Sequence, residues 1–138
     1  MIVRFGMKGS YLLLVELRND AIISIGKYGK KRFDKDCYVY VGSALNGLEQ
    51  RINRHLRSYK KMHWHIDYLL KSAKINGAFY KESKHKEECS IAKKLDRRLV
   101  SIPGFGCSDC NCKSHLFYGS KNDVMNTVDK LKMTPYPI

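Results

Sequence analysis

The chain has 138 residues, with 26 Lys or Arg against 13 Asp or Glu, so its formal net charge at pH 7 is +13. This length suits one compact domain, and the positive excess predicts a polyanionic partner, with nucleic acid ahead of an anionic membrane. The start of the chain does not resemble a signal peptide and no apolar run approaches the ~20 residues of a membrane span, so we expect a soluble cytoplasmic protein without membrane association.

The first part of the chain has the pattern of a β meander. Residues 10–17 (SYLLLVEL) form a short apolar run that predicts a buried strand. Residues 21–33 contain two short strand candidates, and the stretch CYVYVG at residues 37–42 is the next. The two-residue period of a strand places Tyr38 and Tyr40 on the same face.

Helix and strand signals alternate in the rest of the chain. Residues 46–57 carry apolar side chains at spacings of three and four, which is typical of a helix with one buried face. We expect further helices from about Trp64, over residues 86–99 and over residues 121–132, and strands over residues 75–82 and 115–119. This order predicts an α/β fold for residues 1–138: one small domain with a mixed or antiparallel central sheet flanked by helices.

The junction between the strand ending at Gly42 and the following helix carries a chemical signal. Glycine has no Cβ and lets a ligand approach the backbone closely. Arg51 and His55 lie four residues apart on one helix face. Arg can grip a phosphate with two donors, and His can orient a water or move a proton. With Tyr40 nearby, these groups are compatible with a phosphodiester site. From spacing alone, however, we favour a solvated basic helix with His55 half-packed at the core edge.

The same residues resemble the GIY-YIG nuclease superfamily. Gly9-Ser10-Tyr11 and Tyr40-Val41-Gly42 are similar to its two triplets, and YVGSALNGLEQRINRHL is similar to the strand, turn and helix of its homing endonucleases. Residues 9–118 resemble one archaeal and bacterial branch, sometimes fused to an endonuclease III-type DNA glycosylase, through YVYVGSA, KKMHWHIDYLL, EECSIA and GFGCSDCNCKSHLFY. The wide separation of the triplets implies an inserted hairpin at about residues 20–36.

The resemblance implies a metal-dependent endonuclease that hydrolyses phosphodiester bonds in nucleic acid, DNA ahead of RNA, in a role such as DNA repair. Mg²⁺ or Mn²⁺ would be the catalytic ion. The metal-binding glutamate would come from the helix at residues 86–99, where Glu88 is the first choice and Glu87 the reserve. A DNA-repair glycosylase is an expected partner.

The resemblance also implies the roles of the other site residues. Tyr40 would be the general base or the phenol that orients water, with Tyr11 beside it. Arg51 would stabilise charge on the phosphoryl oxygens, and His55 would assist proton transfer. A tyrosine with an ordinary pKa of about 10 is a poor base at pH 7, so Tyr40 would need help from Arg51 or the metal.

A Cys/His-rich loop at residues 104–115 is a second candidate site. Five cysteines in a chain without an export signal indicate thiols or metal ligands rather than a disulfide framework. Thiolate and imidazole are Zn²⁺ ligands. The candidate zinc ligands are Cys107, Cys110, Cys112 and His115. The second cysteine pair of common zinc motifs is missing, so we favour reduced thiols packed near the active face over a zinc site.

The stretch HWHID at residues 63–67 has the His-x-His-x-Asp spacing of binuclear metallo-β-lactamase-fold hydrolases. A helix would separate these side chains, so we favour a helix start in which Asp67 or His63 satisfies local hydrogen bonds. Trp64 would then be a wall of the substrate site, able to stack on a base, or an ordinary core residue.

Clusters of basic residues predict a groove that follows phosphates, although a solvated face is the alternative for each cluster. The predicted nucleic-acid contacts are Lys31, Arg32, Arg54, Arg57, Lys60, Lys61 and Trp64. The rival to a nuclease is a non-catalytic nucleic-acid-binding module, with or without a zinc staple, that is accessory to a repair enzyme. A metal-dependent hydrolase of small substrates ranks third and requires His63, His65 and Asp67 to converge.

Overall fold

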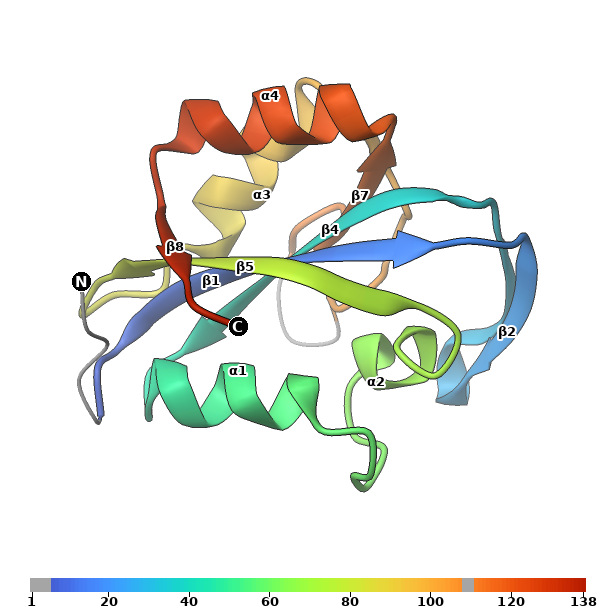
Figure 1. Ribbon diagram of the computed structural model, residues 1–138, viewed down its shortest axis with the longest axis horizontal. Helices are drawn as coiled ribbons and strands as arrows, with labels where there is room; N and C mark the ends of the chain where they lie inside the picture. The colour runs from blue at the N-terminus through green and yellow to red at the C-terminus, as the bar shows by residue number, and fades with distance from the viewer. Residues whose placement is uncertain (1–5, 108–110) are drawn as a thin grey trace.

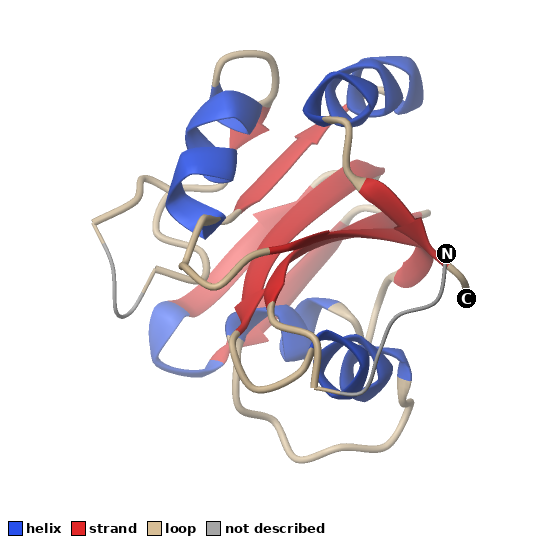
Figure 2. Cartoon of the chain, turned by 90° about the vertical axis from the view of Figure 1, so that its left-hand side faces the viewer, coloured by secondary structure: helices blue, strands red, loops and turns tan. Residues whose placement is uncertain are grey.

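A computed structural model describes residues 6–107 and 111–138, which form one antiparallel sheet between two helical layers (Figures 1 and 2). The sheet has six strands in the order β6-β7-β4-β1-β5-β8. Their bounds are Gly9–Leu17 (β1), Asp36–Ala44 (β4), Lys74–Glu82 (β5), Val100–Ser101 (β6), Leu116–Gly119 (β7) and Thr134–Tyr136 (β8). Every pairing in it is antiparallel, which agrees with the predicted α/β class.

The centre of the sheet is β1, which pairs with β4 on one side and β5 on the other. Leu13 and Val15 belong to the core on one face, whereas Leu12 belongs to the core on the opposite face. A central strand covered on both faces can bury every side chain, and this explains the continuous apolar run in the sequence.

The helices cover the two faces in pairs (Figure 1). Helices α1 (Leu48–Leu56) and α2 (His65–Leu69) pack on the face that contains Tyr38 and Tyr40. Helices α3 (Glu88–Asp96) and α4 (Lys121–Leu131) pack on the other face, against Val39 and Val41. The predicted alternation along this strand is therefore confirmed. Within the described residues, no helix is long and apolar enough to span a membrane.

A two-stranded hairpin occupies the region expected to contain one. Its strands are β2 (Ala21–Ile25) and β3 (Gly29–Phe33), joined by a short 3₁₀ turn. Ile25 and Phe33 are buried in the core beside α2, and the Tyr28 hydroxyl donates to the Pro103 carbonyl at 2.6 Å. The hairpin is thus packed onto the domain and closes the end of the sheet next to α2.

The element limits differ from the predicted ones where the apolar pattern extends beyond the hydrogen-bonded helix. The helix expected over residues 46–57 begins at Leu48, because Gly47 has a φ of 143° that no helix accommodates. The helix expected over residues 86–99 spans Glu88–Asp96 and ends in a turn. Strands β6 and β8 were not predicted, since two- and three-residue edge strands have too few residues to show a period.

Candidate functional site

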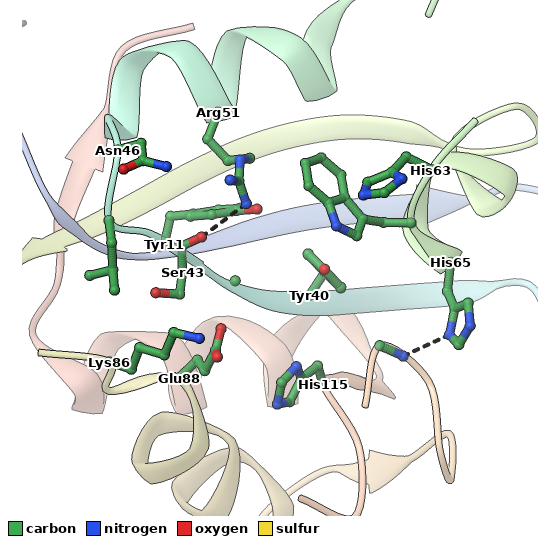
Figure 3. Close-up of a pocket in the computed structure, with 14 residues that line it drawn as sticks. Tyr11, Tyr40, Ser43, Asn46, Arg51, His63, His65, Lys86, Glu88 and His115 are labelled. Atoms are coloured by element: carbon green, nitrogen blue, oxygen red, sulfur yellow. Dashed lines mark hydrogen bonds between the residues drawn. The ribbon is translucent and has the colours of Figure 1, made fainter. Parts of the chain in front are cut away.

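A cavity of about 540 Å³ opens where β1 and β4 meet the helical layers (Figure 3). Arg51 reaches it from α1 on one side of the sheet and Glu88 from α3 on the other. The cavity is lined by Tyr11, Tyr40, Gly42, Ser43, Leu45, Asn46, Arg51, His63, Trp64, His65, Lys86, Glu88, Gly106 and His115. The structure therefore brings together four of the five predicted catalytic residues, which come from four different elements.

The glycine of the Tyr40-Val41-Gly42 triplet has a specific steric role. The register of β1 and β4 sets Gly42 directly opposite Tyr11. A Cβ on Gly42 would overlap the ring and hydroxyl of Tyr11. A side chain here would displace the phenol, so the absence of one lets Tyr11 lie across β4 and line the cavity.

His55 lies behind Tyr11 and does not line the cavity. Both residues are buried, and the Tyr11 hydroxyl is 2.7 Å from His55 Nε2. Burial lowers the pKa of His55 to about 3, although the charge of Asp67 opposes this shift. The imidazole is therefore neutral at pH 7 and contacts Tyr11, not a ligand in the cavity, so the expected role of His55 in proton transfer would act through Tyr11.

The position of the proton on the His55 ring follows from the surroundings of its second nitrogen, Nδ1. His55 Nδ1 is buried and has no hydrogen-bond partner among the described residues. A buried N–H without an acceptor is costly, so we assign the ring proton to Nε2. His55 then donates to the Tyr11 oxygen, and the Tyr11 hydroxyl hydrogen is available to a group in the cavity.

Both cavity tyrosines hold their protons more strongly than free tyrosine. Burial raises the pKa of Tyr40 well above 10, Tyr11 and Glu88 add to the rise, and Arg51 opposes it. Burial also raises the pKa of Tyr11, against the charge and hydrogen bond of Arg51. Each phenol is therefore protonated at pH 7 and can donate a hydrogen bond or hold a water.

Arg51 is positioned by the backbone and by an aromatic ring. Its guanidinium donates to the Ser43 carbonyl at 3.1 Å and lies 4.4 Å from the centre of the Trp64 ring. The Arg54 guanidinium lies 4.3 Å from the same ring. Trp64 thus contacts two cations and lines the cavity, and its role as a wall of a substrate site stays a prediction.

Three of the predicted nucleic-acid contacts are engaged within the protein. Arg54 makes a two-donor ion pair with the buried Asp67, at 3.0 and 2.9 Å. The Lys60 ammonium donates to the His55 carbonyl at 2.6 Å and so caps the end of α1. Arg32 pairs with two acidic neighbours on the hairpin, Asp20 and Asp34, at 3.0 Å each. The role of Arg54 was missed because Asp67 lies 13 residues away in the sequence. Residue type alone also does not show that Arg32 and Lys60 bond to groups nearby in the chain.

The remaining predicted contacts lie nearer to solvent. Arg57 and Lys61 are exposed just beyond α1, and Lys31 is half-buried on β3. Lys86 is exposed and lines the cavity beside Glu88 (Figure 3). It was not predicted, although its position two residues before Glu88 was a usable signal.

Glu88 is the better placed of the two candidate glutamates. Its carboxylate is the one acidic group among the described residues that line the cavity, whereas Glu87 pairs with Lys81 at 2.7 Å. Glu88 also raises the pKa of Tyr11 and Tyr40, which agrees with its placement near both phenols. One carboxylate in an open polar cavity suits Mg²⁺ or Mn²⁺, since Mg²⁺ keeps several of its waters.

The His-x-His-x-Asp stretch does not form a metal site. Asp67 accepts hydrogen bonds from the backbone N–H groups of His63 and Trp64, at 2.9 and 3.0 Å, in addition to its ion pair with Arg54. His65 Nδ1 accepts from the Gly106 N–H at 2.9 Å. The three side chains do not converge, which argues against the small-substrate hydrolase and confirms the preferred helix start.

The cysteine prediction requires a correction. The donor atoms of Cys112, His115 and Cys89 all lie within 4.8 Å of one another, a grouping that can hold a metal. Cys107 does not belong to this group; its thiol donates to the Phe105 carbonyl at 3.4 Å. Cys110 lies outside the described residues. Cys89 was missed as a ligand because it lies on α3, 23 residues before Cys112.

The comparison with protein families matches residues 10–134 to the model described as "Domain of unknown function DUF123". This match covers nearly all of the chain, so the protein belongs to that family. No curated protein and no solved structure matches the chain.

Proposed function

We propose that this protein is a metal-dependent endonuclease of GIY-YIG type that hydrolyses phosphodiester bonds in nucleic acid, with DNA ahead of RNA. The observation that carries the proposal is the convergence of Tyr11, Tyr40, Arg51 and Glu88 on one cavity. The net charge of +13 supports a polyanionic substrate, and DNA repair is the setting that we propose.

The cavity offers a role for each group. Arg51, oriented by Ser43 and Trp64, can give two donors to the phosphoryl oxygens and stabilise the charge that grows there. Tyr40 can hold the attacking water through its hydroxyl. Glu88 would hold Mg²⁺ or Mn²⁺, and the ion when bound would supply Lewis-acid stabilisation and lower the pKa of water.

Tyr11 and His55 act as a unit in this proposal. His55 donates to the Tyr11 oxygen, which leaves the Tyr11 proton directed to the cavity, where it can reach a water or a phosphoryl oxygen. The neutral imidazole holds the phenol in place without adding a buried charge. His55 is therefore a positioning residue, and Tyr11 is the group that meets the substrate.

A cleavage assay with Mg²⁺ or Mn²⁺ on supercoiled, single-stranded, flapped and branched DNA tests the proposal. We expect the wild type to cleave at least one of these substrates, and Arg51→Ala and Glu88→Ala each to lower the rate by about 10²–10³, the usual cost of removing one electrostatic stabiliser. Two matched controls are Arg18→Ala, which removes an exposed arginine just beyond β1 that pairs with Glu16, and Glu87→Gln, which changes the neighbouring carboxylate. Both controls should cleave within about twofold of wild type, a difference of roughly 0.4 kcal/mol in barrier.

Two outcomes would reject the nuclease. Equal cleavage by wild type and both site variants would assign the activity to a contaminant or another site. No cleavage, together with DNA binding that weakens steeply as salt rises, would favour the accessory binding module. The Cys89, Cys112 and His115 group, which can hold a metal staple, is the observation that supports this second candidate.

A further inference from the structure

Three side chains that can bind a metal, two thiols and an imidazole, converge next to the cavity but have no part in its proposed chemistry. Cys89 lies in the first turn of α3, and Cys112 and His115 lie in the segment that leads into β7. Cys89 Sγ is 4.0 Å from His115 Nε2. Cys89 and Cys112 lie at disulfide distance, with their Cα atoms 5.9 Å apart, whereas the sequence had indicated thiols or metal ligands. His115 is buried, and the two cysteines are half-buried.

The spacing and the donor types match one class of ion. In a tetrahedral zinc site the ligand atoms lie about 3.5–3.8 Å apart, close to the separation of Cys89 Sγ and His115 Nε2. The sulfurs of Cys89 and Cys112 lie at disulfide distance in the structure, so the two thiols must be reduced and move apart to bind one ion. Two thiolates and a neutral imidazole balance the charge of one divalent cation, so the complex adds no net charge to a half-buried site. Thiolates select soft ions such as Zn²⁺ and disfavour Mg²⁺.

We propose that Cys89, Cys112 and His115 bind one Zn²⁺ ion that is separate from the ion at Glu88. These residues supply three ligands, and a water or another group takes the fourth position. Reduction of the Cys89–Cys112 pair would free two thiols beside the imidazole of His115, and these three donors together form the group that can bind the ion.

The site connects the two sides of the cavity. Cys89 directly follows Glu88, while the His115 carbonyl accepts from the Val41 N–H at 3.0 Å, next to Tyr40 on β4. His115 also lines the cavity. Bound zinc would therefore tie the start of α3 to the central sheet and fix the position of Glu88 relative to Tyr40. This positioning role rests on the proposed function, whereas zinc binding itself does not.

Metal analysis and cobalt spectroscopy test the site on the full chain. Protein purified in reductant without chelator should contain about one zinc per chain, and Co²⁺ added to the stripped, reduced protein should give the thiolate charge-transfer and tetrahedral d–d absorption of a Cys₂His site. Cys89→Ala and His115→Ala should weaken Zn²⁺ binding by more than the roughly 10–100-fold that second-shell changes cause. Cys37→Ala on β4 and Cys107→Ala are matched controls that should keep the ion, because neither belongs to the ligand group.

The cobalt spectrum of the wild type decides the question even if a variant fails to fold, and His115→Cys, which keeps a ligand, should retain the ion. No thiolate absorption from reduced wild type at equimolar Co²⁺ would overturn the proposal, as would unchanged zinc content in a folded Cys89→Ala variant. A Cys89–Cys112 disulfide that forms in air while the reduced protein binds neither ion would overturn it in favour of a redox pair. None of these readouts uses DNA cleavage, so failure here is distinct from failure of the proposed nuclease.

Discussion

Tyr11 shows how single residues set the chemistry of the cavity. Gly42 makes room for its ring, His55 holds its hydroxyl, and Arg51 opposes the effect of burial on its pKa. The same burial keeps His55 neutral. A neutral buried histidine makes stability depend on pH, because at mildly acidic pH the unfolded chain binds a proton at His55 and the folded chain does not.

We predict that the protein loses stability as the pH falls from 7 to 5. The pKa of His55 is about 3 in the folded chain and about 6.5 in the unfolded chain. The stability that comes from keeping His55 neutral is therefore fully present above pH 6.5 and is lost as the pH falls toward 3. At pH 5 the loss in unfolding free energy should be about 2 kcal/mol. Urea unfolding at pH 7, 6 and 5 measures it.

The control for this prediction is His55→Gln, whose amide can still bond the Tyr11 hydroxyl but does not titrate. Burial also lowers the pKa of His65, which acts in the same direction and remains in the variant. We therefore expect a shallower pH dependence in His55→Gln, not a flat one. Equal slopes for variant and wild type would show that His55 is not buried in its neutral form.

At the scale of elements, the Arg54–Asp67 ion pair joins α1 to the start of α2. Asp67 has no exposed side-chain surface and also accepts the backbone N–H groups of His63 and Trp64. Burial opposes its ionisation, but the hydrogen bonds from Arg54, Trp64 and His63 lower its pKa below the usual value. The pair therefore organises α2 and, through the contact of Arg54 with Trp64, one wall of the cavity.

We predict that Arg54→Ala destabilises the fold by about 3–5 kcal/mol, because it leaves a buried carboxylate without its cation. Arg57→Ala removes an exposed arginine three residues later and should cost no more than about 0.5 kcal/mol. Urea unfolding at pH 7 compares the two. Similar losses in both variants would mean that the ion pair contributes no more than a surface charge.

At the scale of the whole molecule, some basic side chains are paired within the protein and others are exposed to solvent. Arg32, Arg54 and Lys60 have partners within the protein, whereas Arg57 and Lys61 are exposed beyond α1. An exposed cation that neutralises a phosphate releases counterions condensed on the nucleic acid, whereas a cation already paired with a carboxylate contributes less. The net charge of +13 therefore overstates the number of phosphates that the protein can contact.

We predict that affinity for duplex DNA falls steeply with salt and that Arg57→Ala and Lys61→Ala each reduce the slope of log K against log salt by about 0.9. Arg32→Ala is the matched control and should change the slope less, because two aspartates already pair with Arg32. Fluorescence anisotropy from about 50 to 200 mM salt measures all three variants. A larger effect from Arg32 than from Arg57 would place the DNA on the hairpin instead of beside α1.

The sequence by itself determined the secondary structure pattern and part of the cavity. Apolar runs and two-residue alternation are local signals, so β1, β4 and the face shared by Tyr38 and Tyr40 could be predicted. Spacing on α1 likewise placed Arg51 and His55 on one face. Short edge strands could not be predicted, because they depend on pairing with a distant strand. Exact helix ends could not be predicted either, because they depend on the backbone conformation of one residue, such as Gly47 before α1.

The tertiary structure decided which of these residues act together. His55 turned inward to Tyr11, Arg54 and Lys60 were engaged within the fold, and Cys89 replaced Cys107 beside Cys112 and His115. Most of these contacts join segments that are far apart in the chain, and burial also shifts the pKa values of the side chains involved. Residue type and local spacing carry no information about such partners, and so only the folded chain could assign them.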